Sequence, residues 1–375
     1  MQAITSTNEF IIYMKTRFIA LYLPQYHPFK ENNEWWGEGF TEWVNVARAR
    51  TLFKGHYQPH IPKDLGFYDL RLPETRQRQA ELAKIAGVES FCYYDYWFGD
   101  NKRLMERPYD EVVSSGAPDL SFCACWANAS WYNKNWDPKA PEKNKLLIEQ
   151  KYGGEEDYTN HFLSLLPSFK DKRYTRVDGK LFYMITGPLD FNSSEFIQVW
   201  RKLAKEYGLN DFFFVGMTSD SRSKDQILER GFDAIVNNDL LNIHHKLTMF
   251  QKIRLYITRE YMKLPTIFDY KDASKYMLNE DCGDEDVIPC IAPNWDHSPR
   301  SGARAIILKD SDPKYFQELA EKAISIVSSK SDEHKIVVIK SWNEWGEGNY
   351  MEPDLKYGMG YIKALRNAIN NKDQE

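Results

Sequence analysis

Eight short runs of apolar, β-branched or aromatic residues are spaced along the chain, and most are followed by an amphipathic segment of helical period. These runs cover residues 18–23, 88–94, 120–125, 180–186, 212–218, 232–237, 286–292 and 334–341. Near-continuous apolar strands that alternate with helices are typical of a parallel sheet. A count of eight such units predicts a (β/α)8 TIM barrel, a fold of the α/β class.

The connections between these strands show how the chain is organised. Residues 239–285 separate the sixth strand from the seventh and include a basic stretch near 247–264, so we expect a helical insertion there. No internal repeat or low-complexity linker divides the chain. We expect one barrel domain over 17–375 after an N-terminal extension over 1–16. The predicted helices cover 73–86, 155–170, 193–207, 222–230, 312–328 and 359–371.

The charge balance excludes some classes of partner. The formal net charge is −5, and Lys and Arg are scattered rather than striped, so neither nucleic acid nor an anionic membrane surface is indicated. No run approaches the ~18 apolar residues of a membrane span, and the N-terminus lacks a signal-peptide pattern. We expect a cytoplasmic protein without a membrane span. The sequence leaves the oligomeric state open.

The residues that commonly bind metals do not form a recognisable pattern. Five cysteines, an odd number, lie mostly in apolar runs and are expected to be small buried side chains in a reducing compartment. No two pairs have zinc-site spacing. His56 and His60 are four residues apart, but Pro59 between them argues against a metal-binding helix. We expect no metal site.

Polar and aromatic residues follow six of the eight predicted strands, where active sites of this fold lie. The chain is 15% aromatic, with 11 Trp and 23 Tyr, and flat rings beside amides and acids suit sugar rings. One polar strand end is more often a turn or capping device, but six together predict a pocket for an oligosaccharide or polysaccharide. The candidate substrate-binding residues are Gln25, Tyr26, His27, Tyr94, Asp95, Tyr96, Trp126, Asn128, Trp295, Asp296, Trp342 and Asn343.

The last predicted strand runs into the segment SWNEWGEG, which places Glu344 and Glu347 three residues apart. Hydrolysis or transfer of a glycosyl group needs one acid to protonate the leaving oxygen and a second carboxylate as base or nucleophile. Gly346 and Gly348 permit the turn that brings the two carboxylates together. The simpler alternative makes Glu347 a solvated loop residue and Glu344 a capping acid. The position after the last strand favours a catalytic pair.

Two further segments are candidates for the rim of the pocket. Glu38 and Glu42 lie among three tryptophans in EWWGEGFTEW, which suits a sugar subsite and a buried structural loop about equally well. Trp295, Asp296 and Arg300 follow the seventh strand in NWDHSPRSG, which suits a ring-stacking platform with polar clamps.

Several long motifs together carry a family resemblance. They are LYLPQYHP, NEWWGEGFTEW, LFKGHYQPHIPKDLGFYDLRLPE, CYYDYWF, FCACWAN and SWNEWGEGNYMEPD. In this order they resemble the WbsX-type proteins of bacterial surface-polysaccharide clusters, which in turn resemble family ninety-nine glycoside hydrolases, the endo-α-mannosidases. The resemblance spans nearly the whole chain.

The resemblance implies a (β/α)8 fold without a metal or an organic cofactor. It implies that Glu344 and Glu347 are the catalytic pair of a retaining reaction in which the sugar's own 2-hydroxyl is the nucleophile. Glu344 would activate that hydroxyl, and Glu347 would protonate the leaving oxygen. One departure is Ala129 in CWANASW, where the family pattern has an acid. It puts the shared substrate and full activity in doubt.

We therefore expect a carbohydrate-active enzyme that works at a glycosidic bond in bacterial surface-polysaccharide or lipopolysaccharide metabolism. The first alternative is a glycosyltransferase of O-antigen or capsule biosynthesis. The chain shows no phosphate-cradling glycine-rich loop and no Asp-x-Asp motif, which argues against a nucleotide-sugar transferase. The second alternative is an inactive glycan-binding barrel, which Ala129 favours and the two retained glutamates oppose.

Overall fold

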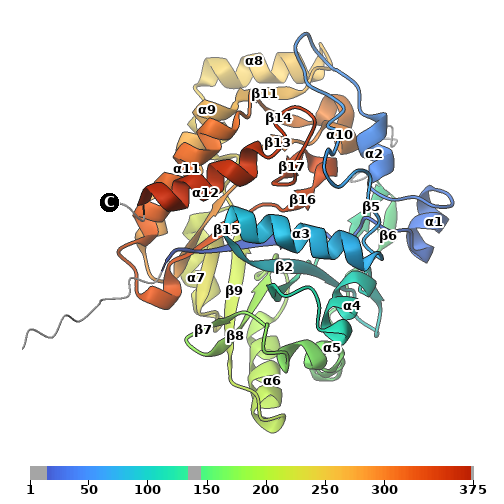
Figure 1. The fold of residues 1–375 in the computed structure, drawn as a ribbon, viewed down its shortest axis with the longest axis vertical. Coiled ribbons are helices and arrows are strands. Elements are labelled where there is room, and N and C mark those ends of the chain that lie inside the picture. Colours follow the sequence, from blue (N-terminus) through green and yellow to red (C-terminus); the bar gives the residue numbers. More distant parts are fainter. Residues whose placement is uncertain (1–14, 134–144, 373–375) are drawn as a thin grey trace, which may run out of the picture.

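The computed structural model describes residues 15–133 and 145–372. Eight parallel strands form a closed ring in the order β1, β15, β12, β10, β9, β8, β4 and β2, and β2 pairs again with β1. Their bounds are β1 Arg17–Tyr22, β2 Val88–Trp97, β4 Ser121–Trp126, β8 Lys180–Ile185, β9 Phe212–Thr218, β10 Ala234–Asn237, β12 Val287–Ile291 and β15 Ile336–Ile339. The predicted (β/α)8 barrel is confirmed, and each predicted strand overlaps one strand of the ring (Figure 1).

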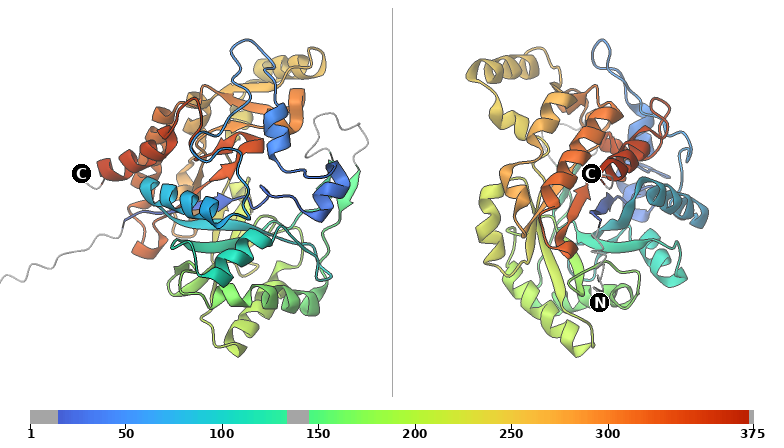
Figure 2. Two further views of the ribbon diagram at one scale, coloured as in Figure 1. Left: turned by 45° about the vertical axis from the view of Figure 1, so that its right-hand side comes forward. Right: turned by 60° about the vertical axis from the view of Figure 1, so that its left-hand side comes forward.

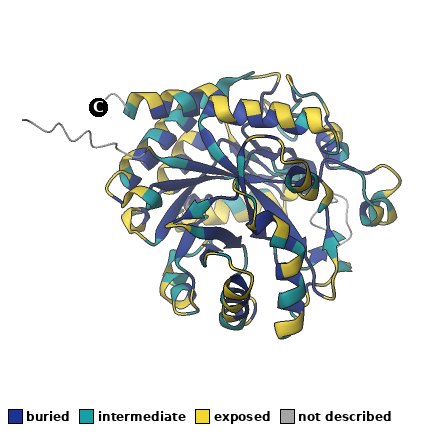
Figure 3. Ribbon diagram, turned by 60° about the horizontal axis from the view of Figure 1, so that its bottom comes forward, coloured by how far each residue is buried: buried dark blue, intermediate teal, exposed yellow. Residues whose placement is uncertain are grey.

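Helices surround this ring and turn their apolar sides toward it. The larger ones are α3 Pro73–Ala86, α4 Arg107–Ser115, α5 Gly154–Phe169, α6 Ser193–Glu206, α11 Pro313–Val327 and α12 Gly360–Lys372, with a short α7 at Lys224–Leu228. Figure 3 shows buried strands in the middle of the molecule and exposed outer faces on the helices. Along each of these helices, buried and exposed residues alternate because the apolar residues recur with the helical period.

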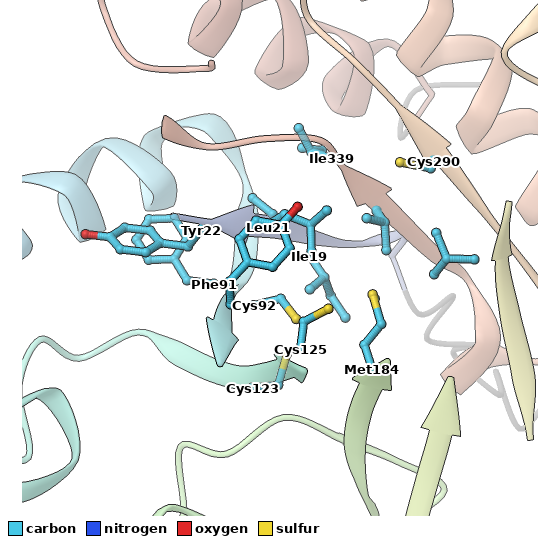
Figure 4. Close-up of a cluster of buried hydrophobic side chains, with 14 of the residues drawn as sticks. Ile19, Leu21, Tyr22, Phe91, Cys92, Cys123, Cys125, Met184, Cys290 and Ile339 are labelled. Carbon is cyan, nitrogen blue, oxygen red and sulfur yellow. The ribbon is translucent and has the colours of Figure 1, made fainter. Parts of the chain in front are cut away.

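The interior of the barrel is filled by side chains from the strands. Figure 4 shows sulfur-containing residues, aliphatic residues and rings that meet there from β1, β2, β4, β8, β12 and β15. All five cysteines are free and buried, as the apolar runs predicted. This packed interior leaves the strand ends and their loops to form a site.

The long connection between β10 and β12 is only partly helical. It contains α8 Met249–Glu260, β11 Thr266–Asp269 and the short α9 Tyr270–Ala273. β11 pairs with β14 Ile306–Lys309, and β14 pairs with β13 Trp295–Asp296, so that a small three-stranded sheet lies beside the barrel. Figures 1 and 2 show α8 at one end of the molecule, above this sheet.

The remaining short elements belong mainly to the loops of the barrel. The connection from β1 to α3 carries α1 Lys30–Trp36 and α2 Trp43–Arg48, and α10 Ser298–Ser301 follows β13. The short strands are β3 Arg103–Leu104, β5 Trp131–Tyr132, β6 Leu146–Ile148, β7 Arg176–Val177, β16 Asn343–Glu344 and β17 Asn349–Tyr350. Of the predicted N-terminal extension, residues 1–14 lie outside the described residues.

Candidate active site

The two glutamates of SWNEWGEG lie in a loop that begins where β15 ends. β16 pairs antiparallel with β17, so the chain turns back on itself between Glu344 and Asn349. The buried Asn343 side chain accepts a hydrogen bond from Leu23 N at 2.8 Å and donates one to Leu23 O at 3.0 Å. Asn343 therefore ties this loop to the end of β1, at the C-terminal face of the barrel.

Trp345 fixes the loop to its surroundings through two hydrogen bonds. Its Nε1 donates to Glu352 at 2.7 Å, and its backbone N–H donates to Tyr26 Oη at 2.9 Å. Glu352 also accepts from Tyr68 at 2.9 Å and from Gln79 at 2.6 Å. Burial raises the pKa of Glu352 to about 7, although these donors oppose the rise. Tyr26 and Trp345 are thus packed inside the protein.

The carboxylates of Glu344 and Glu347 are held in different environments. Glu344 is buried and accepts a hydrogen bond from Ser341 Oγ at 2.8 Å. Burial raises its pKa, and the charge of Glu347 adds to the rise. Glu347 accepts a hydrogen bond from Arg300 Nη1 at 2.6 Å. Burial opposes its charge as well, but the positive charges of Arg300 and Lys340 outweigh burial and lower its pKa.

Arg300 links Glu347 to a third carboxylate, that of Glu42. Its Nε donates to Glu42 Oε2 at 2.5 Å, and Glu42 also accepts from Asn45 Nδ2 at 3.0 Å. Glu42 and Arg300 are both buried. His297 lies 3.7 Å from Glu347 through Nε2, and burial lowers the pKa of this imidazole. The segment EWWGEGFTEW therefore reaches the site through Glu42, whereas Glu38 is exposed.

Lys340 is a residue of the site that sequence analysis missed. Burial disfavours its charge, but the carboxylates of Glu344 and Glu347 prevail and raise its pKa. Its Nζ lies 5.5 Å from the centre of the Trp295 ring, a cation–π distance. Lys340 is the residue just after β15, where it reads as part of an apolar run.

Trp295 and Lys340 line a cavity of about 410 Å³ at the strand ends. Its other walls include Ser219, Asn238 and Asp239, which follow β9 and β10. The indole of Trp295 is partly exposed, unlike the indoles of Trp126 and Trp342, which are fully buried. Of the predicted ring-stacking residues, Trp295 is the one that the structure leaves accessible.

Tyr94 and Tyr96 lie close to the candidate pair. Both phenols are nearly buried, and their rings are 6.1 Å apart. Burial raises the pKa of each hydroxyl, and Glu344 is the charged group that adds most to the rise in both. The neighbouring Asp95 is differently placed. Its carboxylate lies 2.9 Å from Arg103 and 2.6 Å from His161, on the side of α5.

Several predicted binding residues make their contacts within the protein. Asp296 accepts hydrogen bonds from Gln58 and Ser298 and lies 2.7 Å from His56 Nε2. Burial raises its pKa, but His56, His60 and Ser298 outweigh burial and lower the pKa to about 2. Asn128 bonds both backbone groups of Gly187. Trp126 donates to a backbone carbonyl. These contacts hold the loops of the site in place.

Gln25 and His27 are buried beside the end of β1. Each carries a side-chain atom, Gln25 Oε1 and His27 Nδ1, that has no hydrogen-bond partner. Burial lowers the pKa of His27 to about 4. Ala129, the departure from the family pattern, is exposed just beyond Asn128. A carboxylate at position 129 would therefore reach solvent at the rim.

Trp295 also lines a second cavity, of about 210 Å³. Its lining includes Tyr57, Tyr357 and Lys356, with Lys356 Nζ within 4.8 Å of both ring centres. Within residues 15–133 and 145–372, no group of three or more His, Cys, Asp or Glu side chains is arranged to hold a metal ion. In the same part of the chain, no helix is long and apolar enough to cross a membrane.

A (β/α)8 barrel with one buried and one partly buried glutamate at its C-terminal face is an arrangement typical of enzymes that act on glycans. Comparison with known families is more specific. The family described as glycosyltransferase WbsX matches residues 18–365, and the chain belongs to that family.

Two curated relatives are the uncharacterized WxcX proteins from two strains of Xanthomonas campestris pv. campestris. Each is 32% identical over 355 residues, which cover 94% of this chain and 49% of the relative. The chain thus spans about half the length of the curated relatives it matches.

Solved structures with the same fold include a family GH99 endo-α-mannosidase from Bacteroides thetaiotaomicron. It has 14% identity and a TM-score of 0.57, and the match covers 96% of this chain and 98% of that one. A glycoside hydrolase-like protein has 15% identity and a TM-score of 0.56, with 98% of this chain and 97% of that one covered. At such identities the likeness shows a shared fold.

The Gly346→Ala substitution should destabilise the site loop. A Cβ at this position would collide with the Glu42 carboxylate and lie 3.0 Å from Arg300 Nε, so the buried ion pair would have to shift. We expect the free energy of unfolding to fall by about 1–3 kcal/mol in chemical denaturation. Gly283→Ala is the control, because a Cβ there meets nothing within 4 Å. Equal stability of the two variants would contradict the tight packing around Gly346.

The Arg300→Met substitution should destabilise the fold by about 3–5 kcal/mol at neutral pH, because the buried Glu42 and the partly buried Glu347 would lose the guanidinium that contacts both. The loss should shrink in acid. Since the pKa of Glu347 is lowered in the folded protein, its contribution to stability is present above the usual glutamate pKa and lost as the pH falls through the lowered value. Chemical denaturation at neutral and acid pH measures this difference.

Arg222→Met is a matched control, because the exposed Arg222 pairs with Asp220 at the surface. It should leave the stability almost unchanged at both pH values. A loss in Arg300→Met that is the same at neutral and acid pH would show that Arg300 acts by packing rather than by charge.

Proposed function

We propose that the protein cleaves or transfers a glycosyl group at a glycosidic bond, with Glu344 and Glu347 as the catalytic pair. The observation that carries this proposal is the pair itself. Two carboxylates three residues apart are held at the C-terminal face of the barrel, and their surroundings move their pKa values in opposite directions. Acid–base chemistry at one bond requires two carboxyl groups whose pKa values differ in this way, so that one holds a proton while the other is charged.

The cavity lined by Trp295 and Lys340 supports a glycan as substrate, because the charge of Lys340 acts on both glutamates. Its partly exposed Trp295 offers a flat face for a sugar ring, and Ser219, Asn238 and Lys340 offer groups that can bond to hydroxyls. Membership of the WbsX family supports a role in bacterial surface-polysaccharide metabolism. The sugar acceptor or water that completes the reaction then distinguishes a transferase from a hydrolase.

We assign the roles that the family resemblance implies. Glu344 takes the proton of the sugar 2-hydroxyl, whose oxygen attacks the anomeric carbon while the bond to the leaving oxygen breaks. Glu347 gives its proton to that oxygen and later takes one from the water or hydroxyl that opens the 1,2-anhydro sugar. As the ring opens, Glu344 returns its proton to the 2-oxygen. The overall reaction retains the anomeric configuration.

This assignment places a demand on Arg300. In the substrate-free protein, the contact between Arg300 and Glu347 favours the carboxylate of Glu347, whereas the pKa of Glu344 is raised. Glu347 must hold a proton before it can act as an acid. Substrate binding therefore has to weaken the contact between Arg300 and Glu347 and leave the shared negative charge on Glu344.

Two glutamine substitutions test the pair and its roles. Glu347→Gln should lower turnover of sugar-leaving substrates by about 10²–10⁴-fold, because the proton donor is lost, and should affect activated aryl leaving groups far less. Glu344→Gln should slow both kinds of substrate alike, because the 2-hydroxyl loses its base. Turnover is measured on aryl and oligosaccharide α-mannosides, surface polysaccharides and nucleotide sugars. Glu38→Gln, at an exposed glutamate, is the control.

The outcomes separate the hypotheses. If Glu344→Gln rather than Glu347→Gln spares the aryl substrates, the two roles are reversed. Metal-dependent turnover of nucleotide sugars by the parent protein would favour an ordinary nucleotide-sugar transferase. If both variants are folded and turn over substrate as fast as the parent protein, Glu344 and Glu347 have a structural role.

A further inference from the structure

Helix α8 exposes an unusual amount of apolar surface. The exposed fractions are 74% for Met249, 77% for Phe250, 51% for Ile253, 57% for Tyr256 and 46% for Ile257. Tyr261, just after the helix, is 75% exposed. No residue of α8 is buried. Large side chains gathered in this way on a surface mark a place where another apolar surface binds.

These residues share one face of the helix. At 3.6 residues per turn, the six side chains fall within an arc of about 140°. Leu255 projects from the opposite side, where it packs against the core. The helix is thus attached by one side and presents its apolar face outward. A capping box formed by Thr248 and Gln251 fixes its first turn, so the face is well defined.

Basic residues border this apolar face. Lys252 lies along one edge and Arg254 along the other, at positions that follow from the same helical period, and Lys263 follows three residues after the end of the helix. All three are exposed. Arg259 is paired with Glu260, the one acid between residues 246 and 263. The chain as a whole has a net negative charge, but the residues around the apolar face of α8 are locally basic.

We propose that α8 binds the surface of an anionic lipid membrane and lies in its interface, with the apolar face among the acyl chains and the basic edges on the headgroups. A basic, amphipathic helix with aromatic and aliphatic residues on one face has the properties of such interfacial helices. The charge complements anionic lipid. Pairing with a second copy would bring the basic edges of two helices together, and that arrangement is disfavoured.

The test uses the full chain and vesicles of phosphatidylcholine, with or without phosphatidylglycerol, in a flotation assay. The parent should bind the anionic vesicles, and salt should weaken binding. Phe250→Ser with Ile257→Ser should lower the partition coefficient about tenfold or more, because two apolar side chains no longer enter the membrane. Lys252→Glu with Lys263→Glu should lower it to a similar extent.

Leu72→Ser and Lys205→Glu are the controls, because they change an exposed apolar residue just before α3 and an exposed lysine on α6. Both should bind like the parent. Circular dichroism and thermal unfolding check that every variant is folded. Absence of binding by the parent, or equal binding by the α8 variants, would overturn the proposal. The proposal would also be overturned if the parent formed a dimer, did not bind vesicles, and became monomeric in the Phe250→Ser, Ile257→Ser variant.

Discussion

The site depends on one buried guanidinium placed between two carboxylates. Arg300 contacts Glu42 from the connection after β1 and Glu347 from the loop after β15, so it joins both to the segment after β13. Breaking such a contact leaves buried charge without a partner, which costs far more than a surface ion pair contributes. Glu344 has no direct contact of this kind among the described residues. Burial and the charge of Glu347 therefore raise its pKa, whereas Arg300 lowers the pKa of Glu347, and the two glutamates become chemically distinct.

The polar residues at the strand ends therefore have two different roles. Asn343, Asn128 and Asp296 make hydrogen bonds that fix loops, and those of Asn343 tie the loop of Glu344 and Glu347 to the end of β1. Trp295 and Lys340 face the cavity instead. A site of this kind needs both groups, because a catalytic side chain is effective only when its neighbours hold it in one place.

The sequence was sufficient to predict the barrel, but it was not sufficient to predict which polar residues hold the loops and which face the cavity. Each strand is a local apolar run that is recognisable by itself, as β9 is with FFFVGMT. The contacts that decide a side chain's role are not local. Asp296 meets His56 across 240 positions, and nothing in either segment indicates this. Lys340 was missed because it ends an apolar strand. The apolar face of α8 was missed because exposure cannot be distinguished from burial by helical period alone.

The central claim is that Glu344 and Glu347 act on one glycosidic bond. A crystal structure of the Glu347→Gln variant with an uncleaved oligosaccharide tests it most directly. The account predicts that the glycosidic oxygen lies about 2.6–3.2 Å from the side chain at position 347. It also predicts the 2-hydroxyl of the same sugar beside Glu344 and a ring against Trp295. An oligosaccharide bound only in the cavity lined by Tyr57 and Tyr357, with no glycosidic oxygen within hydrogen-bond distance of either glutamate, would contradict the account.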